Sequence, residues 1–391
     1  MTTTTPTMTD PDPTPILLQD RFTLQRNPVD NKLQAWDAAD EHLLNFLAEH
    51  DSLSSSSRIL ILNDAFGALA VALNEHRVFG WSDSLLAQQA LTKNLMLNDL
   101  SAEQLTTNTG IDFASDLGKE EFDFILIKIP KTLALLEHQL FELRDKLAPG
   151  AIVVAAGMAR NIHSSTLALF ETILGPTTTT RAWKKSRLIN VDAKADFNRA
   201  ENPYPQDYQL DVGREFNITN HANLFSREKL DMGSRFLLEH MPVGEQYRRI
   251  VDLGCGNGLL GIVAAERNAE ASLLFSDESY MAIASARINF EAAFEGNRSA
   301  EFRVSDCLQG VAADSQDLVL VNPPFHQTYQ IGDHVAWNMF KDARRVLVEA
   351  GELWVVGNRH LGYQSKLKKL FGRCDVVASN KKFVVMRAAK Q

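Results

Sequence analysis

The second half of this 391-residue chain repeats the pattern of its first half. The run ILILNDAFGALAVAL, which begins at Ile59, matches the run IVDLGCGNGLLGIVA, which begins at Ile250. Each consists of a short apolar segment, a loop that contains glycine and a helical pattern. Four further pairs keep the same order at an offset of about 190 to 200 residues: WSDS and FSDES, FDFILIKIPK and QDLVLVNPPF, AIVVAAG and ELWVVGN, and TTRAWKKSRLINV and VASNKKFVVMRA. The common order indicates a duplicated unit.

Short apolar runs alternate with helical patterns in both halves. Strands that are buried on both faces and connected by helices form mostly parallel sheets. We therefore predict an α/β protein with two doubly wound domains, residues 16–192 and 208–391, joined by a polar linker at residues 193–207. Residues 1–15 contain no lysine, no arginine and no apolar core of a signal peptide, and we predict that they form a disordered leader.

Charge and cysteine content exclude several classes of function. The formal net charge of -9 argues against a generally basic nucleic-acid-binding protein. Two segments are nevertheless basic: residues 351–391 hold nine basic and two acidic side chains, and residues 181–199 hold six and two. The three cysteines are far apart and fit neither a disulfide framework nor a zinc site. No apolar run reaches the roughly 18 residues of a membrane helix, so we predict a cytoplasmic protein without a metal or a membrane span.

The loop after the first apolar run of the second half has the composition of a nucleotide cradle. Asp252 precedes three glycines at alternate positions, Gly254, Gly256 and Gly258, and a helical pattern follows. Glycines let a ligand approach the backbone closely, and the free N–H groups at the start of a helix can bind it. Because such a turn can also merely connect a strand to a helix, further residues are needed to assign a site.

Two aspartates that follow the next apolar runs support a cofactor site. Asp277 follows SLLFS, where a carboxylate can accept hydrogen bonds from the ribose hydroxyls of NAD or of S-adenosylmethionine. Asp306 follows FRVS and is positioned to meet an adenine edge, although it could instead cap a helix. Both residues are therefore candidates for binding a nucleoside-containing cofactor.

The motif Asn322-Pro323-Pro324-Phe325 directly follows the apolar run DLVLV. Open α/β sheets bind ligands at the carboxyl ends of their strands, so this motif would lie beside the cofactor. The Asn322 side-chain oxygen and the Pro323 carbonyl can accept hydrogen bonds from a planar exocyclic amine, and Phe325 can stack on its ring. Alone, the motif could be a strand-terminating turn. Because a dehydrogenase has no need of it, the motif favours S-adenosylmethionine over NAD.

These motifs resemble those of the class I S-adenosylmethionine-dependent methyltransferases, in particular the members with an Asn-Pro-Pro-aromatic motif, which methylate amino groups of nucleobases or glutamine. The runs HANLFSREKLDMGSRFLLEHM from His221 and GNRHLGY from Gly357 narrow the resemblance to the tandem-domain ribosomal RNA guanine-N2 methyltransferases, the RsmC/RlmG family. LQAWDAADEHLL and GPTTTTRAWKKSRLI in the first half resemble its large-subunit branch. The resemblance implies S-adenosylmethionine as the cofactor and a guanine of 23S ribosomal RNA as the substrate. It also implies that Phe225 and Ser226 cover the cofactor, although Ser226 and Asp231 could simply cap a helix.

The resemblance further implies that the first half is a degenerate methyltransferase copy. Its loop at residues 62–68 (LNDAFGA) keeps only Gly67 of the three glycines, and Phe66 would occupy cofactor space. The run KIPK at residues 128–131 replaces the NPPF motif. We hypothesise that this half binds RNA, although its lysines could equally be solvated surface groups. The candidate RNA contacts in both halves are Lys128, Lys131, Lys184, Lys185, Arg187, Lys381 and Lys382.

Several alternatives remain open from the sequence. N2-methylation of a guanine in 16S ribosomal RNA is the main one, followed by methylation of an adenine amine or of a protein glutamine. An RNA-binding module without turnover is disfavoured because the glycines and the NPPF motif are intact. An NAD oxidoreductase is disfavoured by the position of Leu259 in the glycine loop, although Gly261 prevents a clean exclusion. We interpret His326 and His360 as structural rather than as acid–base catalysts, and we expect a monomer.

Overall fold

The computed structural model describes residues 18–30, 32–111, 113, 117–194, 197, 200–324 and 329–391. The predicted leader at residues 1–15 lies outside the described residues. The chain divides into two compact units, the first with residues up to 82, 87–108 and 116–200, and the second with residues 83–86, 109–115 and 201–391. The boundary between the two units after residue 200 falls within the segment predicted to be a linker. The membership of residues 83–86 and 109–115 in the second unit has no counterpart in the sequence analysis.

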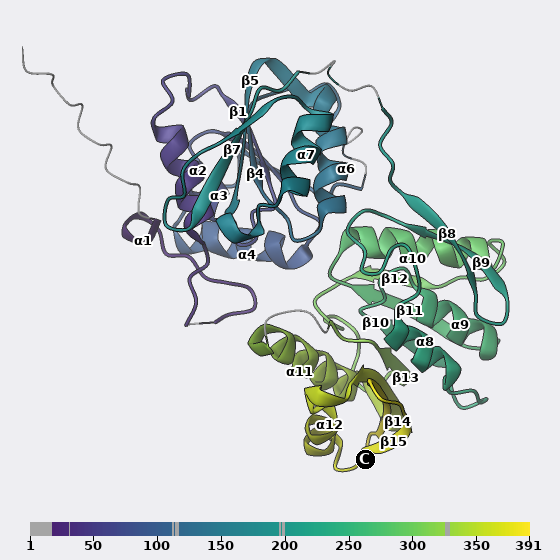
Figure 1. Ribbon diagram of the computed structural model, residues 1–391. Coiled ribbons are helices and arrows are strands. Elements are labelled where there is room, and N and C mark those ends of the chain that lie inside the picture. Colours follow the sequence, from purple (N-terminus) through teal and green to yellow (C-terminus); the bar gives the residue numbers. More distant parts are fainter. Residues whose placement is uncertain are drawn as a thin grey trace, which may run out of the picture. The chain divides into compact units, whose positions relative to one another are not determined.

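The first unit contains a seven-stranded sheet with the strand order β3-β2-β1-β4-β5-β7-β6. Strands β1 to β5 are parallel, whereas β7 pairs antiparallel with both β5 and β6. Helices flank the sheet in Figure 1, with α2 and α3 on one side and α6 and α7 on the other. The strands are β1 (Arg58–Leu62), β2 (Arg77–Trp81), β3 (Leu105–Asn108), β4 (Phe122–Lys128), β5 (Leu147–Met158), β6 (Thr177–Thr179) and β7 (Ser186–Val191). The helices in this part of the sequence are α1 (Leu18–Arg21), α2 (Ala38–Ala48), α3 (Ala68–Ala72), α4 (Leu85–Leu97), α6 (Leu133–Leu143) and α7 (Ser164–Ile173), with short 3-10 helices η1 (Arg144–Lys146) and η2 (Ala159–Asn161).

The second unit contains a seven-stranded sheet with the order β12-β11-β10-β13-β14-β16-β15 and a two-stranded antiparallel ribbon, β8 and β9. The sheet is again parallel except for β16, which pairs antiparallel with β14 and β15. The strands are β8 (Gln206–Asp211), β9 (Glu215–Asn220), β10 (Arg249–Leu253), β11 (Ser272–Asp277), β12 (Glu301–Val304), β13 (Gln316–Val321), β14 (Leu347–Asn358), β15 (Asp375–Ser379) and β16 (Phe383–Ala389). The helices are α8 (Met232–Glu239), α9 (Leu259–Arg267), α10 (Tyr280–Ala293), α11 (Tyr329–Val346) and α12 (Tyr363–Phe371), with the 3-10 helix η3 (Arg359–Leu361).

The two large sheets have the same topology. Replacing β1 to β7 by β10 to β16 in the strand order of the first sheet gives the strand order of the second. The five matched sequence runs lie on corresponding strands and on the loops that follow them. The prediction of two tandem, mostly parallel α/β domains is therefore confirmed.

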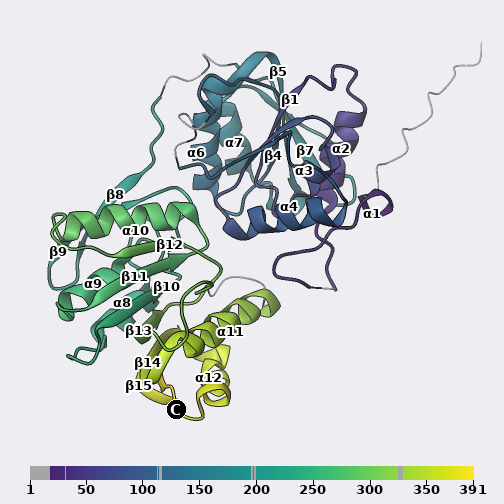
Figure 2. The same cartoon turned by 180° about the vertical axis from the view of Figure 1, so that it is seen from behind.

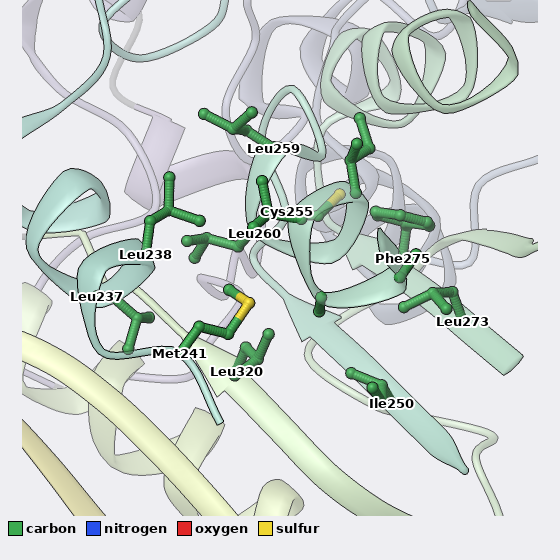
Figure 3. Close-up of a cluster of buried hydrophobic side chains, with 14 of the residues drawn as sticks. Leu237, Leu238, Met241, Ile250, Cys255, Leu259, Leu260, Leu273, Phe275 and Leu320 are labelled. Atoms are coloured by element: carbon green, nitrogen blue, oxygen red, sulfur yellow. The ribbon is translucent and has the colours of Figure 1, made fainter. Parts of the chain in front are cut away.

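Alternate residues of the central strands pack into separate hydrophobic clusters on the two faces of the second sheet. Ile250 and Leu320 pack with side chains of α8, α9 and α10, and Figure 3 shows part of this cluster. Val251 and Val319 point to the opposite face and pack with α11 and α12. Figures 1 and 2 show these two groups of helices on opposite faces of the sheet. Burial on both faces explains why these strands read as continuous apolar runs, and each buried aliphatic side chain contributes roughly 1.5–3 kcal/mol.

Among the helices of the described residues, none combines the length and the apolar character that a membrane crossing requires.

The loop glycine that the first unit retains permits a test of its packing. Gly67 begins α3 with a φ of +76°, and a Cβ there would lie 2.7 Å from the Leu91 Cα. We expect Gly67→Ala to lower the free energy of unfolding by at least about 2 kcal/mol, because it combines left-handed backbone strain with a clash against a helix backbone. Gly80→Ala is the matched control, since a Cβ at Gly80 meets nothing within 4 Å. Urea unfolding of both variants measures the difference, and equal stabilities would contradict this packing.

Candidate active site

The carboxyl ends of three neighbouring strands bring the predicted site residues to one edge of the second sheet. The glycine loop follows β10, β11 ends at Asp277, and Asn322 directly follows β13. β10 lies between β11 and β13 in parallel register, with Leu253 opposite both Ser276 and Val321. The cofactor and amine-binding candidates therefore share the edge at which open α/β sheets bind ligands.

The glycine loop has the backbone conformation of a cradle. The φ angles are +69° at Gly254, +54° at Gly256 and +81° at Gly258, and Gly258 is the N-cap of α9. The Gly254 N–H donates to the Ser276 carbonyl oxygen at 2.8 Å, and the Cys255 N–H donates to the same oxygen at 3.1 Å. These bonds hold the loop against the end of β11.

The last two glycines of the loop serve different purposes. A Cβ at Gly258 would lie 2.9 Å from the Ala286 Cβ and 3.0 Å from the Ala286 Cα, so this glycine allows α9 to pack against α10. A Cβ at Gly256 would meet nothing within 4 Å. Packing within the chain therefore does not require a glycine at this position. The left-handed φ favours one, and the space beside the backbone is open to a ligand.

Asp277 connects the glycine loop to the start of α10. One carboxylate oxygen accepts a hydrogen bond from the Gly256 N–H at 3.0 Å, and the other accepts one from the Ser279 N–H at 3.0 Å. Burial raises the pKa of Asp277 above its ordinary value. The Glu278 N–H also hydrogen-bonds this carboxylate, which has about four acceptor positions. The side chain is therefore fixed in place and can still accept a hydrogen bond from a hydroxyl group.

The other predicted cofactor residues lie in loops. Asp306 is half-buried after β12, and a turn follows it rather than a helix of the described residues, so it is not a helix cap. Phe225 is 61% exposed, and the Ser226 hydroxyl donates to the Lys229 carbonyl oxygen at 2.9 Å. The N-cap of α8 is Asp231. The cofactor contacts of Phe225, Ser226 and Asp306 stay predictions.

Only the nitrogen of the Asn322 side-chain amide has hydrogen-bond partners among the described residues. Its Nδ2 donates to the Asp231 Oδ2 at 3.1 Å and to the Ser234 Oγ at 2.8 Å. Its Oδ1 is buried and has no hydrogen-bond partner within the described residues. A buried acceptor without a donor costs roughly 1–3 kcal/mol, and this oxygen can still accept an N–H group.

The rest of the NPPF motif is described only in part. Pro323 is buried and Pro324 is exposed. Phe325 and His326 lie outside the described residues, so stacking by Phe325 stays a prediction. His360 is exposed in η3.

Asp252 lies beneath the glycine loop and is fully buried. Its Oδ2 accepts a hydrogen bond from the Gly261 N–H at 2.8 Å, and its Oδ1 has no partner in the part of the chain that the structure describes. Burial raises the pKa of Asp252 to about 8, and the nearby Asp277 contributes in the same direction. The side chain is therefore mostly protonated at neutral pH and binds α9 to β10 rather than carrying charge.

In the first unit, a carboxylate of the chain itself binds the helix start at the corresponding loop. The strand register aligns the glycine loop with residues 63–67. The Asp64 carboxylate accepts hydrogen bonds of 2.9 to 3.0 Å from the N–H groups of residues 68–70, at the start of α3. The Arg26 guanidinium lies 4.6 Å from the centroid of the Phe66 ring. The helix N-terminus that would face a cofactor is thus already bound by a carboxylate.

Lys128 occupies the position of Asn322 and forms two ion pairs. Its Nζ lies 2.9 Å from the Asp37 Oδ1 and 2.6 Å from the Asp40 Oδ2, and its side chain is 14% exposed. Burial would lower the pKa of Lys128, but Asp40 and Asp37 raise it above its ordinary value, so it stays charged. The ammonium group of Lys128 is thus engaged by two carboxylates of the chain, and its contact with RNA stays a prediction.

The other candidate RNA contacts are on the surface. Lys184 pairs with Glu41 at 2.9 Å and lies 4.6 Å from the centroid of the Trp183 ring, which reduces the charge it presents. The remaining candidates are exposed and stay predictions: Lys131, Lys185, Arg187, Lys381 and Lys382. Within the described ranges, no group of three or more His, Cys, Asp and Glu side chains is arranged to hold a metal ion.

The amino-acid sequence of this chain is similar to those of known proteins along nearly its whole length. Residues 14–195 match the family model of the RLMG N-terminal domain, and residues 215–387 match that of the methyltransferase small domain. Ribosomal RNA large subunit methyltransferase G of Aeromonas hydrophila is 47% identical over 377 residues, which cover 95% of this chain and 97% of that relative. The protein of the same name in Yersinia pestis is 48% identical over 374 residues, with 95% and 92% covered. The chain belongs to this methyltransferase family.

A solved structure has the same fold as this chain over both units. The T. thermophilus 16S rRNA N2 methyltransferase RsmC, in complex with AdoMet and guanosine, superposes with a TM-score of 0.73 and covers 91% of this chain and 92% of its own. At 20% identity this likeness concerns the fold. The prediction of two class I methyltransferase domains in tandem agrees with it.

The sequence analysis considered Asp231 as a helix cap and did not single out Ser234. The structure shows that Asp231 caps α8, accepting from the Ser234 N–H at 2.9 Å, and that both side chains also bind the Asn322 amide. The signal in the sequence was weak. The pair lies 91 and 88 residues before Asn322, and only the packing of α8 beside the end of β13 reveals the contact.

The pKa of Asp252 predicts a specific pH dependence of stability. Because the folded-state pKa of about 8 exceeds the unfolded value near 4, the unfolded chain releases this proton first as pH rises. The contribution of Asp252 to the free energy of unfolding therefore falls between about pH 4 and pH 8 and then levels off. Asp252→Asn cannot ionise, so we expect it to gain stability relative to wild type across this window, by at most about 1.4 kcal/mol per pH unit. Urea unfolding of both proteins at pH 5 and pH 8 measures this, and a pH-independent difference would refute it.

The two glycines at the end of the loop should respond differently to alanine. We expect Gly256→Ala to fold with a loss of about 1–2 kcal/mol from left-handed strain, but to lose most of its affinity for S-adenosylmethionine because the Cβ enters the cradle. Gly258→Ala should lose considerably more stability, since its Cβ also clashes with α10. Thermal unfolding and calorimetric titration with S-adenosylmethionine separate the two effects. Full affinity in a folded Gly256→Ala protein would place the cofactor elsewhere.

Proposed function

We propose that this chain transfers the methyl group of S-adenosylmethionine to the N2 amine of a guanine in large-subunit (23S) ribosomal RNA. The observation that carries the proposal is the buried Asn322 Oδ1, an acceptor that no donor of the described residues satisfies. It lies at the edge of the sheet that also carries the glycine loop and Asp277. The name of the relatives, which are 47–48% identical over nearly the whole chain, supports large-subunit ribosomal RNA as the substrate class.

The side chains at this edge fit S-adenosylmethionine. Gly256 leaves space that a Cβ would occupy, so a ligand can approach the backbone of the loop that leads into α9. Asp277 is fixed by backbone N–H groups and retains an acceptor position for a ribose hydroxyl, and Asp306 follows the neighbouring strand. When bound, the cofactor supplies a methyl group activated by attachment to a sulfonium sulfur.

Asn322 and Pro323 would prepare the nucleophile. The lone pair of the guanine N2 amine is delocalised into the ring, which makes the nitrogen a poor nucleophile. If the Asn322 Oδ1 and the Pro323 carbonyl oxygen accept its two N–H groups, the nitrogen becomes more tetrahedral and its lone pair points toward the methyl carbon. Alignment of these atoms then accounts for most of the rate, and no covalent intermediate with the protein is needed.

We further propose that exposed cations near this edge bind the phosphate groups of RNA. Lys381 and Lys382 form the turn before β16, whose first residue, Phe383, pairs with Asn358 at the end of β14. Because β14 is parallel to β13, this turn lies at the same edge as Asn322. The Lys382 carbonyl oxygen accepts a hydrogen bond from the Arg359 N–H at 3.1 Å, which places three cationic residues together. Phosphate contacts of this kind position an RNA without reading its sequence.

Methyl transfer to defined RNA tests the activity. We expect wild type to transfer labelled methyl from S-adenosylmethionine to protein-depleted 23S RNA, with the label recovered as N2-methylguanosine. Asn322→Ala should lose about 100-fold or more in kcat while it retains affinity for S-adenosylmethionine. The control is Asn217→Ala, which removes an exposed amide of β9 that donates to Asp207.

The RNA substrate distinguishes the alternatives. Label in 16S RNA alone would move the assignment to the small-subunit branch. Label in neither RNA, with S-adenosylmethionine still bound, would refute the proposed substrate.

A further inference from the structure

We propose that Asp231 and Ser234 are positioning residues that fix the orientation of the Asn322 amide, so that only its oxygen faces the substrate. The inference rests on the proposed function, because it assigns a task to residues behind the amine-binding atom. Both residues come from the first turn of α8, far from Asn322 in the sequence.

The hydrogen bonds define one orientation of the amide. Asn322 has two N–H groups on Nδ2, and these donate to the Asp231 Oδ2 at 3.1 Å and to the Ser234 Oγ at 2.8 Å. A rotation of the amide by 180° would turn Oδ1 toward a carboxylate, which has no hydrogen to donate. The same rotation would direct the N–H groups at the substrate. The two acceptors therefore make Asn322 an acceptor at the site rather than a donor.

The acceptors themselves are held rigidly. The Asp231 Oδ2 that binds Asn322 also accepts the Ser234 N–H at 2.9 Å, as the N-cap of α8. Gly233 lies between them, where a Cβ would be 2.9 Å from the Asp231 Oδ2 and 3.4 Å from the Phe383 ring. The absence of a side chain at Gly233 lets the N-terminal start of α8 approach the carboxyl edge of the sheet.

The first unit contains the same arrangement with different chemistry. Asp37 caps α2 as Asp231 caps α8, and Asp40 stands three residues later, as Ser234 does. Lys128 is the last residue of β4, and the strand register places it where Asn322 follows β13. Its Nζ contacts the Asp37 and Asp40 carboxylates, as the Asn322 Nδ2 contacts Asp231 and Ser234. Both copies thus hold a hydrogen-bond donor against two acceptors in the first turn of this helix.

The two units differ in the kind of atom that Lys128 or Asn322 can present to a ligand. Lys128 has only donors, and its two acceptors are both carboxylates, so the pairing neutralises it. Asn322 has an oxygen on the other side of the same amide, and this oxygen has no hydrogen-bond partner among the described residues. We call the hydrogen bonds from the Asn322 Nδ2 to Asp231 and Ser234 the clamp. The clamp favours a ligand that presents an N–H group to the Asn322 Oδ1, and it disfavours one that presents a carbonyl oxygen there. This is the distinction between an exocyclic amine and a keto group on a base edge.

Substitutions at Asp231 separate helix capping from amide positioning. Serine, asparagine and aspartate are equally good N-caps, so Asp231→Ser and Asp231→Asn should both keep α8. Asparagine still presents an oxygen that reaches Asn322, whereas the serine side chain is too short. We expect Asp231→Ser and Ser234→Ala to lose roughly 10- to 100-fold in kcat, and Asp231→Asn to stay within about threefold of wild type. KM for RNA, affinity for S-adenosylmethionine and Tm should change little. Asp211→Ser is the control, because it removes an exposed turn carboxylate of the same unit that accepts from the Gly213 N–H.

A direct readout of the amide makes the inference independent of activity. In protein labelled with ¹⁵N at asparagine, the Asn322 Nδ2 signal, identified by its loss in Asn322→Ala, should shift and exchange faster in Asp231→Ser than in Asp231→Asn. Equal kcat values for the serine and asparagine variants, or an unchanged Asn322 signal in Asp231→Ser, would overturn the clamp. A wild-type protein without methyl transfer whose Asn322 signal still responds to Asp231→Ser would overturn the proposed function and leave the clamp intact.

Discussion

The parallel pairing of β10 with β11 on one side and β13 on the other determines where the residues of the candidate site lie. In this arrangement the chain leaves all three strands at the same edge, so the glycine loop, Asp277 and Asn322 meet there although they are separated along the sequence. Register is also fixed, because alternate side chains of β10 enter two separate hydrophobic clusters. A slip of one residue would exchange the faces and turn Asp252 away from α9. The burial of the core thus sets the geometry of the site.

The duplicated fold supports two different uses of one position. At the end of the fourth strand of the sheet, the second unit places an amide and the first unit places an ammonium group. Side chains at the start of α8 bind the amide, and side chains at the start of α2 bind the ammonium group. In the first unit, carboxylates of the chain itself neutralise Lys128, and the Asp64 carboxylate binds the start of α3. The first unit therefore keeps the scaffold, while Lys128 and the start of α3 bind carboxylates of the chain itself.

At the carboxyl edge of its sheet and beneath the glycine loop, the second unit holds polar groups that are buried without partners among the described residues. The Asn322 Oδ1 and the Asp252 Oδ1 have no hydrogen-bond partner within the described residues, and burial raises the pKa of Asp252 and of Asp277. Each such group costs free energy of folding. Binding sites commonly retain this kind of cost, because an acceptor that is already satisfied cannot recognise a ligand. The unpartnered Asn322 oxygen is consistent with a site whose final hydrogen bonds form with the substrate.

The sequence by itself determined the duplication, the α/β class and the places of the glycine loop, Asp277 and Asn322 at strand ends. These follow from local patterns, since buried strands read as apolar runs and loops that approach a ligand need glycine. Only the tertiary structure decided that Lys128 is buried in ion pairs and that Asp231 and Ser234 bind Asn322. In both cases the partners lie about 90 residues away in the sequence. Hydrogen bonds and ion pairs between side chains depend on distances of a few ångströms, and these are set by how helices pack on a sheet rather than by the residues next along the chain.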